Sequence, residues 1–473
     1  MNVPNSVEII KQNNLCIGCG VCAGLCPAQG LVMEFNLYGE YNPVRRNSDC
    51  FENCGLCFQV CPFSDKEENE DSLAKIIFGN IEGIKHRSET GYYLDSYVGY
   101  SKVCDHRANG ASGGVATWLL ETLLAKQIID YVICVTPHQE PEKLFRFAVF
   151  DTFEPIRRSA RSAYYPVEMS EVVRYIIENE GRYAISGLPC FIKGLRLAAR
   201  KNKKLRDRIR ITIGLVCGQM KSKHYTSYLA FLAGVRGPLL EVNFRGKALG
   251  VPANNYFFQC TDQENNQGKL FWRDGVDKVW NNRWFTPRAC SFCDDVFAEL
   301  ADVVLMDAWL PEYIVDWKGT NLIIVRVPLL RQAIESGIEE GQLEGKRISI
   351  DRIIQSQLGV LNVKRNKLAY RLYLAKQKGA VVPTKREAPS GEANFFTRKE
   401  IELKDKMQEL SRELFLQCTD GGERNLKTFS DKMDLLVTEL ENWARFGRIV
   451  RLPARGIRKA AREIGRVREI GRI

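Results

Sequence analysis

The stretch CIGCGVCAGLCP at residues 16–27, together with CFENCGLCFQVCP at residues 50–62, decides the fold at the start of this 473-residue chain. The first stretch has the spacing C-x2-C-x2-C-x3-C and the second C-x3-C-x2-C-x3-C, and each ends in Cys-Pro. Closely spaced thiolates can bind three corners of one iron–sulfur cubane, and the cysteine before the proline reaches the cubane of the other motif. The pattern therefore predicts two [4Fe–4S] clusters within residues 1–75, in a fold like that of bacterial ferredoxins.

This crossed pattern assigns each of the eight cysteines to one cluster. Cluster one is expected to bind Cys16, Cys19, Cys22 and Cys61, and cluster two Cys50, Cys54, Cys57 and Cys26. Structural thiols or two zinc sites would also account for eight cysteines. Zinc sites, however, usually present paired C-x2-C knuckles rather than triplets that end in Cys-Pro, so iron–sulfur clusters are the better interpretation.

Composition and charge narrow the class of protein. The chain has sixteen cysteines, but its first residues lack the basic-then-apolar pattern of a secretion signal, which favours metal or redox chemistry over disulfides. No stretch approaches about 18 uncharged apolar residues, so we expect no transmembrane helix and a cytoplasmic protein. The net charge is +11, yet residues 1–74 contain ten acidic and four basic residues, whereas residues 443–473 contain ten Arg or Lys and two Glu. The two ends are therefore expected to face different partners.

The rest of the chain divides by its hydrophobic pattern. Between residues 95 and 335, strand-like and helix-like segments alternate, which predicts an α/β domain. Strands are expected at 96–102, 129–135, 182–186, 209–216, 302–306 and 321–327, a hairpin at 255–273 and a helix at 115–126. After about residue 345 the pattern is helical and polar, with a linker at 381–397 and long helices at 398–416 and 424–446. The predicted fold class is thus α+β and α/β, with four parts: a ferredoxin-like domain (1–75), a central α/β domain (95–335), a helical extension (345–446) and a basic tail (447–473). The acidic run at 65–71 is interpreted as a solvated boundary of the first domain, and a linker is expected at about 75–94.

A glycine-rich segment, NGASGG at residues 109–114, precedes the helix expected at 115–126. Backbone N–H groups at the start of a helix can bind phosphate, and glycines permit close approach. The segment matches neither G-x-G-x-x-G nor a P-loop, and an ordinary helix cap with a turn is the alternative. Because a flavin couples single-electron clusters to two-electron substrates, a flavin nucleotide would suit such a loop.

A second group of cysteines lies downstream. Cys190 and Cys217 follow expected strands, whereas Cys290 and Cys293 lie together in a loop. Loops at strand ends can converge in an α/β domain, so these four could bind a third cluster; buried apolar thiols are the alternative. The remaining cysteines, Cys104, Cys134, Cys260 and Cys418, are interpreted as structural.

At these residues the chain resembles the coenzyme F420 hydrogenase/dehydrogenase beta-subunit family, which also includes ferredoxin-dependent reductases of the chlorophyll pathway. The similar segments occur in the same order along the central domain. They are residues 112–114, 161–164, 186–190, 214–218, 243–247 and 290–302. Each segment is short, but their combination is specific.

The resemblance implies FAD in the central domain and a third [4Fe–4S] cluster there. The implied cluster ligands are Cys190, Cys217, Cys290 and Cys293. The implied FAD contacts are Ser112, Gly113, Gly114, Arg161, Ser162 and Tyr164. The chain departs from the family at Ala163, where Lys is common, and at Met306, where Gly before Asp is more usual.

The sequence therefore predicts an iron–sulfur flavoprotein oxidoreductase. It would pass electrons between [4Fe–4S] clusters and FAD, and on to a two-electron acceptor or donor that is deazaflavin-like, a tetrapyrrole or another small molecule. Ferredoxin or another redox protein is the expected partner. The alternatives are a non-catalytic electron-transfer subunit and a redox sensor. No catalytic residue can be named, and Arg245 and Lys247 either contact an anionic ligand or belong to a solvated turn.

The basic tail at 447–473 has three interpretations. It could contact an anionic membrane surface, which would make the protein peripheral to a membrane. It could also dock an acidic partner or simply be solvated. Nucleic acid is not an expected partner, because the sequence contains no base-stacking module.

Overall fold

The N-terminal part of the chain folds around its cysteines. The computed structural model describes residues 6–46, 54–64, 68–419 and 425–448. The first elements are α1 (Ser6–Gln12), α2 (Val21–Leu25), β1 (Leu31–Phe35), β2 (Tyr41–Arg45) and α3 (Leu56–Gln59), and β1 pairs with β2 in antiparallel fashion. Both α2 and α3 begin directly after a left-handed glycine, Gly20 (φ 76°) and Gly55 (φ 53°). Side-chain-bearing residues rarely adopt this conformation, so these glycines let the chain turn tightly between successive cysteines.

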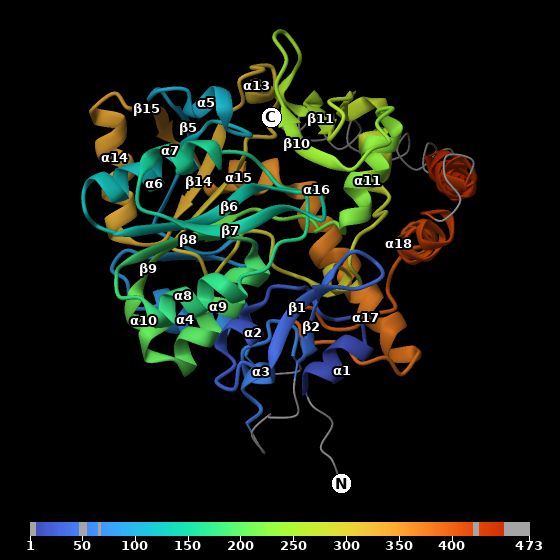
Figure 1. Ribbon diagram of the computed structural model, residues 1–473, viewed down its shortest axis with the longest axis horizontal. Helices are drawn as coiled ribbons and strands as arrows, with labels where there is room; N and C mark the ends of the chain where they lie inside the picture. Colours follow the sequence, from blue (N-terminus) through green and yellow to red (C-terminus); the bar gives the residue numbers. More distant parts are fainter. Residues whose placement is uncertain (1–5, 47–53, 65–67, 420–424, 449–473) are drawn as a thin grey trace, which may run out of the picture.

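A large mixed sheet forms the centre of the molecule (Figure 1). Among the described residues, eight strands follow the order β15-β5-β14-β13-β9-β8-β6-β7. Their bounds are β5 (Asp95–Ser101), β6 (Tyr131–Glu140), β7 (Lys143–Phe150), β8 (Tyr183–Gly187), β9 (Ile209–Leu215), β13 (Val303–Asp307), β14 (Asn321–Val325) and β15 (Leu343–Arg347). Strands β6, β8, β9 and β13 are parallel to one another, and the other pairings are antiparallel. The loops after β8, β9 and β13 therefore meet at one edge of the sheet, where ligands usually bind in such folds.

Helices cover both faces of this sheet (Figure 1). One face carries α5 (His106–Asn109), α6 (Val115–Ala125), α7 (Phe153–Arg158) and α14 (Pro328–Glu339), and the other carries α8 (Ser170–Glu178), α9 (Pro189–Lys201) and α10 (Lys203–Arg208). On the first face Trp118 and Ile334 share a core with the strands, and on the second Phe191 and Leu195 do so. Helix α9 begins at Pro189, where a proline is well tolerated because the first helical N–H has no partner within the helix.

The N-terminal part packs against the second helical face rather than standing apart. Val21 and Leu25 of α2 belong to the same apolar core as Val173 of α8 and Leu195 of α9. Helix α4 (Glu70–Phe78) follows, capped by Asn69, and leads into a hairpin of β3 (Lys85–Arg87) and β4 (Gly91–Tyr93). The cysteine-rich part and the central domain are therefore joined by a continuous core.

A smaller sheet lies beside the large one. It contains β10 (Leu239–Gly246), β11 (Phe257–Asp262) and β12 (Gln267–Phe271) in that order. The same part of the chain also forms short helical elements, which are α11 (Lys223–Leu232), η1 (Ala253–Asn255), η2 (Trp272–Val276), α12 (Asp277–Asn281), η3 (Arg288–Phe292) and α13 (Pro311–Ile314).

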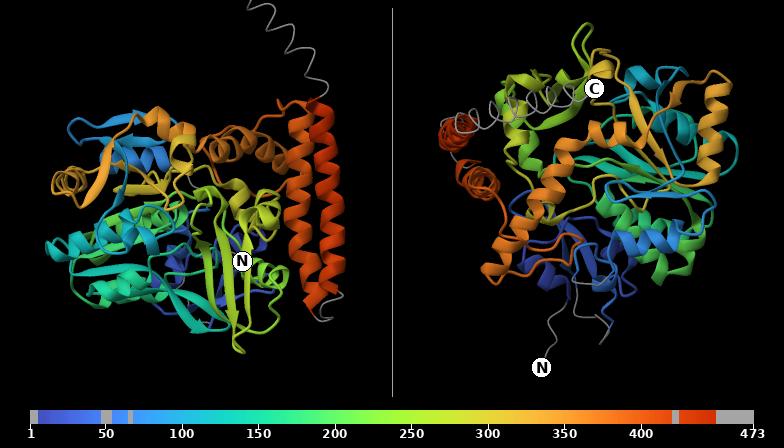
Figure 2. Two further views of the ribbon diagram at one scale, coloured as in Figure 1. Left: turned by 90° about the horizontal axis from the view of Figure 1, so that it is seen from above. Right: turned by 180° about the vertical axis from the view of Figure 1, so that it is seen from behind.

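The C-terminal extension is helical and returns toward the N-terminal part. Its elements are α15 (Ile350–Ser356), α16 (Leu358–Leu361), η4 (Asn362–Asn366), α17 (Lys367–Gln377) and α18 (Phe395–Thr419), followed by a helix at residues 425–448. Figure 2 shows α18 and this last helix side by side along one side of the molecule. Arg412 of α18 lies 3.0 Å from the buried carboxylate of Glu40, so the extension contacts the cysteine-rich part directly.

The predicted fold class is confirmed: a large sheet, a ferredoxin-like N-terminal region and a helical C-terminal part are all present. The expected strands match β5, β6, β8, β9, β13 and β14 within a few residues, and the hairpin at 255–273 matches β11 and β12. The linker expected at about 75–94 instead contains the end of α4 and the β3–β4 hairpin, because Leu73, Ala74 and Phe78 are buried against the core. No helix among the described residues is long and apolar enough to span a membrane. Most of the basic tail, residues 449–473, lies outside the described residues.

Candidate functional site

The thiols assigned to cluster one lie close together. Burial, and then the neighbouring thiols of Cys19, Cys16 and Cys61, raise the pKa of the Cys22 thiol well above its ordinary value. Burial raises the pKa of Cys19 to about 12, with Cys61 contributing in the same direction. Thiolates in such a place are costly unless a bound cation offsets their charge. The group therefore fits an iron–sulfur cluster, whose iron supplies that positive charge.

The backbone around this group approaches the sulfur atoms closely. The N–H of Gly18 donates to the Sγ of Cys16 at 3.4 Å. Gly18 is left-handed (φ 72°), and a Cβ at this position would lie 2.8 Å from the carbonyl oxygen of Tyr41. Only glycine fits this turn without strain.

The thiols assigned to cluster two border an open cavity of about 520 Å³. Its lining includes Cys26, Cys54 and Cys57 together with Cys22, Gly30 and Arg45. Cys50, the fourth expected ligand, lies outside the described residues. Cys26 thus lies with thiols of the second motif, and burial and then Cys61 raise the pKa of the Cys16 thiol above its ordinary value. The crossed ligand assignment stays a prediction.

The downstream cysteines also come together. Cys190 is the second residue of α9, Cys217 lies just beyond β9, Cys290 is in η3 and Cys293 follows it. Burial, and then Cys293, Cys217 and Cys290, raise the pKa of the Cys190 thiol well above its ordinary value. The N–H of Met220 donates to the Sγ of Cys290 at 3.4 Å. Among the described residues no three His, Cys, Asp or Glu side chains converge tightly enough to hold a single metal ion.

Two of these thiol groups are neighbours. The Cys19 thiol is among the groups that raise the pKa of Cys190. One turn further along α9, a Cβ built on Gly194 would lie 3.8 Å from the Sγ of Cys19 and 3.2 Å from Cγ2 of Val21. Helix α9 thus has Cys190 in its first turn and packs Gly194 against the cysteine-rich part. The remaining cysteines show no such grouping among the described residues: Cys104 is exposed, and Cys134, Cys260 and Cys418 are buried.

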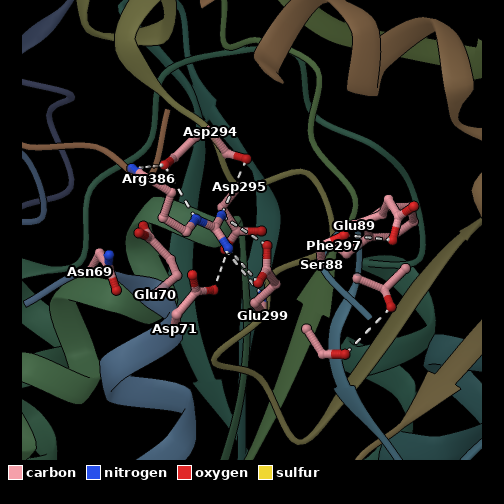
Figure 3. Close-up of polar contacts among 12 residues, drawn as sticks. Asn69, Glu70, Asp71, Ser88, Glu89, Asp294, Asp295, Phe297, Glu299 and Arg386 are labelled. Atoms are coloured by element: carbon pink, nitrogen blue, oxygen red, sulfur yellow. Dashed lines mark hydrogen bonds and ion pairs between the residues drawn. The ribbon is translucent and has the colours of Figure 1, made fainter. Parts of the chain in front are cut away.

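A network of charged side chains surrounds the loop that follows Cys293 (Figure 3). The carboxylates are Asp294 and Glu299 of that loop and Glu70 and Asp71 of α4, and the cations are Lys385 and Arg386 from the segment between α17 and α18. Burial opposes the charge of Asp294, but Lys385 and Arg386 outweigh it and hold the pKa of that carboxyl well below its ordinary value. The extension therefore binds the cysteine loop and the N-terminal part at the same point.

A second cavity, of about 380 Å³, opens at the carboxyl end of β13. The lining combines the glycine-rich loop with charged and aromatic side chains. It includes Ala111, Ser112, Arg245, Lys247, Tyr256, Asp307, Trp309, Tyr313 and Trp317. Aromatic walls beside cations suit a planar ligand that carries negative charge.

Arg245 and Lys247 set the electrostatics of this cavity. Arg245 donates to both carboxylate oxygens of Asp307 at 2.9 and 3.0 Å, yet its buried Nε has no hydrogen-bond partner within the described residues. Lys247 donates to the carbonyl oxygens of Arg107, Ser112 and Lys318, and burial lowers its pKa to about 7. The solvated-turn interpretation of these two residues is therefore wrong, because both lie at the cavity.

The six residues expected to contact FAD have different places. Ser112 lines the cavity, and its Oγ donates to the carbonyl oxygen of Thr320 at 2.7 Å. Gly113 and Gly114 are packed against backbone, where a Cβ would come within 2.8 Å of Asn321 and 2.4 Å of His106 respectively. Tyr164 reaches the wall through its Oη, which lies 3.3 Å from Arg245. Within the described part of the chain, Ser162 and the exposed Arg161 are not among the lining residues.

Sequence reasoning missed several residues of these sites. Asp307 and Trp309 lie at the end of β13, a position that could have been recognised from the predicted strand. Lys364, whose Nζ lies 3.1 Å from the Sγ of Cys293, comes from the extension and carries no local signal.

Comparisons with known proteins give the family of the chain. Residues 96–174 and 180–350 match the N-terminal and C-terminal parts of the family described as coenzyme F420 hydrogenase/dehydrogenase, beta subunit, and residues 15–64 match a 4Fe-4S dicluster domain. An uncharacterized protein of Methanocaldococcus jannaschii is 23% identical over 248 residues, which are 45% of this chain and 62% of that protein. A chain of the F420-reducing [NiFe] hydrogenase complex from Methanosarcina barkeri has a TM-score of 0.47 and 17% identity, covering 61% of this chain and 96% of that chain. The two family matches together span more than half of the sequence, and the chain therefore belongs to the coenzyme F420 hydrogenase/dehydrogenase beta-subunit family, with a 4Fe-4S dicluster domain near its N-terminus.

Proposed function

We propose that the chain is an iron–sulfur flavoprotein oxidoreductase that passes electrons between [4Fe–4S] clusters and FAD. Three clusters are proposed, with the ligands given by the three cysteine groups. The observation that carries the proposal is the adjacency of Cys19 and Cys190. This adjacency would bring cluster one beside the third cluster, so that the N-terminal part can exchange single electrons with the central domain.

A short series of contacts leads from the third cysteine group to the cavity. Met220 donates to Cys290, and the Nζ of the next residue, Lys221, lies 5.0 Å from the ring centre of Trp280. The Trp280 ring lies 4.7 Å from the ring of Tyr164, which in turn contacts Arg245 at the cavity wall. These packed side chains keep the thiols and the cavity within one region, which supports electron exchange between them.

The cavity residues fit FAD. The cations Lys247 and Arg245, with Ala111 and Ser112 of the glycine-rich loop, would hold the negative charge of the cofactor, and the aromatic walls would hold its planar ring. Bound FAD would supply the coupling between one-electron clusters and a two-electron substrate. The proposed acceptor or donor is a deazaflavin-like molecule, a tetrapyrrole or another small molecule.

A second candidate is a non-catalytic electron-transfer subunit of a larger redox complex. The family description favours it, because it names a beta subunit. In that case the partner would hold the substrate, and this chain would reduce dyes without any small-molecule substrate. Ferredoxin as a partner, membrane-surface contact through residues 447–473 and a cytoplasmic location remain further proposals.

The test is anaerobic purification of the full-length chain. Three clusters predict about twelve iron atoms per chain, since each cubane contains four, together with FAD released on denaturation. Flavin reduction is then screened against a deazaflavin, NAD(P)H and reduced ferredoxin. A colourless, iron-free protein, or one that binds zinc at these thiols, would contradict the proposal, and about eight iron atoms would remove the third cluster alone.

A further inference from the structure

We propose that Lys364 raises the reduction potential of the third cluster by donating a charged hydrogen bond to the thiolate of Cys293. This inference rests on the proposed function, because it requires a cluster at Cys190, Cys217, Cys290 and Cys293. It gives the C-terminal extension a role in redox chemistry. Lys364 lies in η4, beyond residue 350, where the match to the beta-subunit family ends.

The geometry places the ammonium group directly at the sulfur. The Nζ of Lys364 lies 3.1 Å from the Sγ of Cys293 and 2.9 Å from the carbonyl oxygen of Asp295. The residue is only 4% exposed. Water therefore screens its charge far less than it would at the surface.

The neighbouring cations of the extension are arranged differently. Arg365 pairs with Glu299, and Lys367 pairs with Glu400. Within the described part of the chain, no carboxylate pairs with Lys364. The positive charge of Lys364 therefore acts on the Cys293 sulfur and is not neutralised by a paired carboxylate.

The surrounding loop holds this contact in place. The carboxylate of Asp294, the residue after Cys293, lies 3.4 Å from Lys385 and 3.3 Å from Arg386. The Asp295 carbonyl accepts from Lys364. Two anchored residues therefore follow Cys293 directly, and its sulfur remains within reach of Lys364 without further rearrangement.

The direction of the effect follows from charge. Four thiolates give the cluster unit a net negative charge, and one-electron reduction makes it more negative. A buried positive donor stabilises the reduced form more than the oxidised form, and hydrogen bonds to the sulfurs are among the factors that set the potential of such clusters. Lys364 should therefore make the third cluster easier to reduce.

The experiment is an EPR-monitored redox titration of the anaerobic full-length protein. The signal that changes in Cys293→Ser identifies the third cluster. In Lys364→Met its reduction equilibrium constant is expected to fall about tenfold, which lowers the midpoint potential by about 59 mV. Lys364→Arg, which keeps the charge, should shift less, and the control Lys367→Met should leave the potential unchanged.

Two results would overturn the inference. One is an unchanged third-cluster potential in Lys364→Met. The other is loss of about four iron atoms from Lys364→Met with the other clusters intact, which would show that the lysine only supports the loop. A wild-type protein that already contains only about eight iron atoms would instead contradict the third cluster of the proposed function.

Discussion

Arg386 binds the carboxylate of Glu299 with two hydrogen bonds, from Nη1 to Oε2 at 2.7 Å and from Nη2 to Oε1 at 2.9 Å (Figure 3). The same guanidinium lies 2.9 Å from Asp71 of α4 and 3.3 Å from Asp294 of the cysteine loop. One residue of the extension therefore joins the N-terminal part, the loop after Cys293 and the segment between α17 and α18. Glu299 and Asp294 are fully buried, and each has a second cation beside it, Arg365 and Lys385 respectively.

Arg386→Met should destabilise the protein by about 1.5–3 kcal/mol, because it removes two charge-assisted hydrogen bonds from the buried Glu299 carboxylate and one of the two cations beside Asp294, while Arg365 and Lys385 remain. The measurement is urea-induced unfolding of the anaerobic protein. The matched control is Arg182→Met, since Arg182 also binds one carboxylate through two nitrogen atoms, that of Asp130, but at an exposed site. An exposed pair contributes at most about 1 kcal/mol. Equal losses in the two variants would show that the Arg386 network is not important for stability.

Gly194→Val should weaken the contact between the cysteine-rich part and α9. A Cβ at Gly194 is already 3.2 Å from Val21, and a branched side chain would press on Val21 and Cys19. We expect weaker magnetic coupling between the two neighbouring reduced clusters, measured by EPR, with the iron content unchanged. Gly359→Val in α16 is the control, because nothing lies within 4 Å of a Cβ there. If the magnetic coupling is unchanged in Gly194→Val, the two clusters interact through a part of the molecule other than this contact.

The parts of the site that sequence reasoning predicted are those with local spacing. The motifs around Cys16 and Cys54 contain their ligands within a few residues, so their chemistry can be recognised from the sequence alone. Cys190 and Cys217 meet because β8 and β9 are adjacent parallel strands. Their positions after strands suggested this grouping only as one of two alternatives, and the family resemblance favoured it. Lys364 lies 71 residues from Cys293, and no local pattern connects them.

The burial of charged side chains was the other feature that could not be predicted from the sequence. The acidic run at 65–71 suggests a solvated boundary, yet Glu70 is 4% exposed and accepts from the buried Lys193, 123 residues away, at 3.0 Å. A charged residue is rarely buried without a partner, and the partner of Glu70 lies on α9, which the sequence does not place next to α4. Long-range pairing of this kind therefore cannot be predicted from composition.

Lys247→Met should lower the FAD content of the purified protein. Lys247 donates to three carbonyl oxygens around the glycine-rich loop, and it supplies positive charge to the cavity. Flavin fluorescence after denaturation measures the loss. The control is Lys269→Met, an exposed lysine on β12 of the same small sheet. Full FAD occupancy in Lys247→Met would show that the cofactor does not depend on this cation.

The lowered pKa of Lys247 predicts that FAD binding depends on pH. Because burial lowers the pKa of Lys247 to about 7, the free protein loses this positive charge as the pH rises above that value. The Kd for FAD should therefore rise above about pH 7, by no more than about tenfold per pH unit, since one proton is involved. Lys247→Arg should flatten the profile, because an arginine stays charged. Identical profiles for the two proteins would assign the titration to another group.

Protonation of His224 should lower the free energy of unfolding in mild acid. Burial, and then Lys223 and Arg412, lower the pKa of this imidazole to about 4, and the ring packs edge-on against Phe415 of α18 at 4.9 Å. The unfolded chain takes up a proton near pH 6.5, whereas the folded protein takes it up only near pH 4. Stability contributed by the neutral ring is therefore complete above about pH 6.5 and is lost as the pH falls toward 4, by about 1.4 kcal/mol per pH unit. Urea unfolding at about pH 7, 6 and 5 measures this slope.

His224→Asn should be less stable at pH 7 but show a shallower decline, whereas His86→Asn, at an exposed position of β3, should decline like the wild type. If His224→Asn declines as steeply as the wild type, the acid sensitivity arises from another group and α18 is not held in place by a neutral histidine.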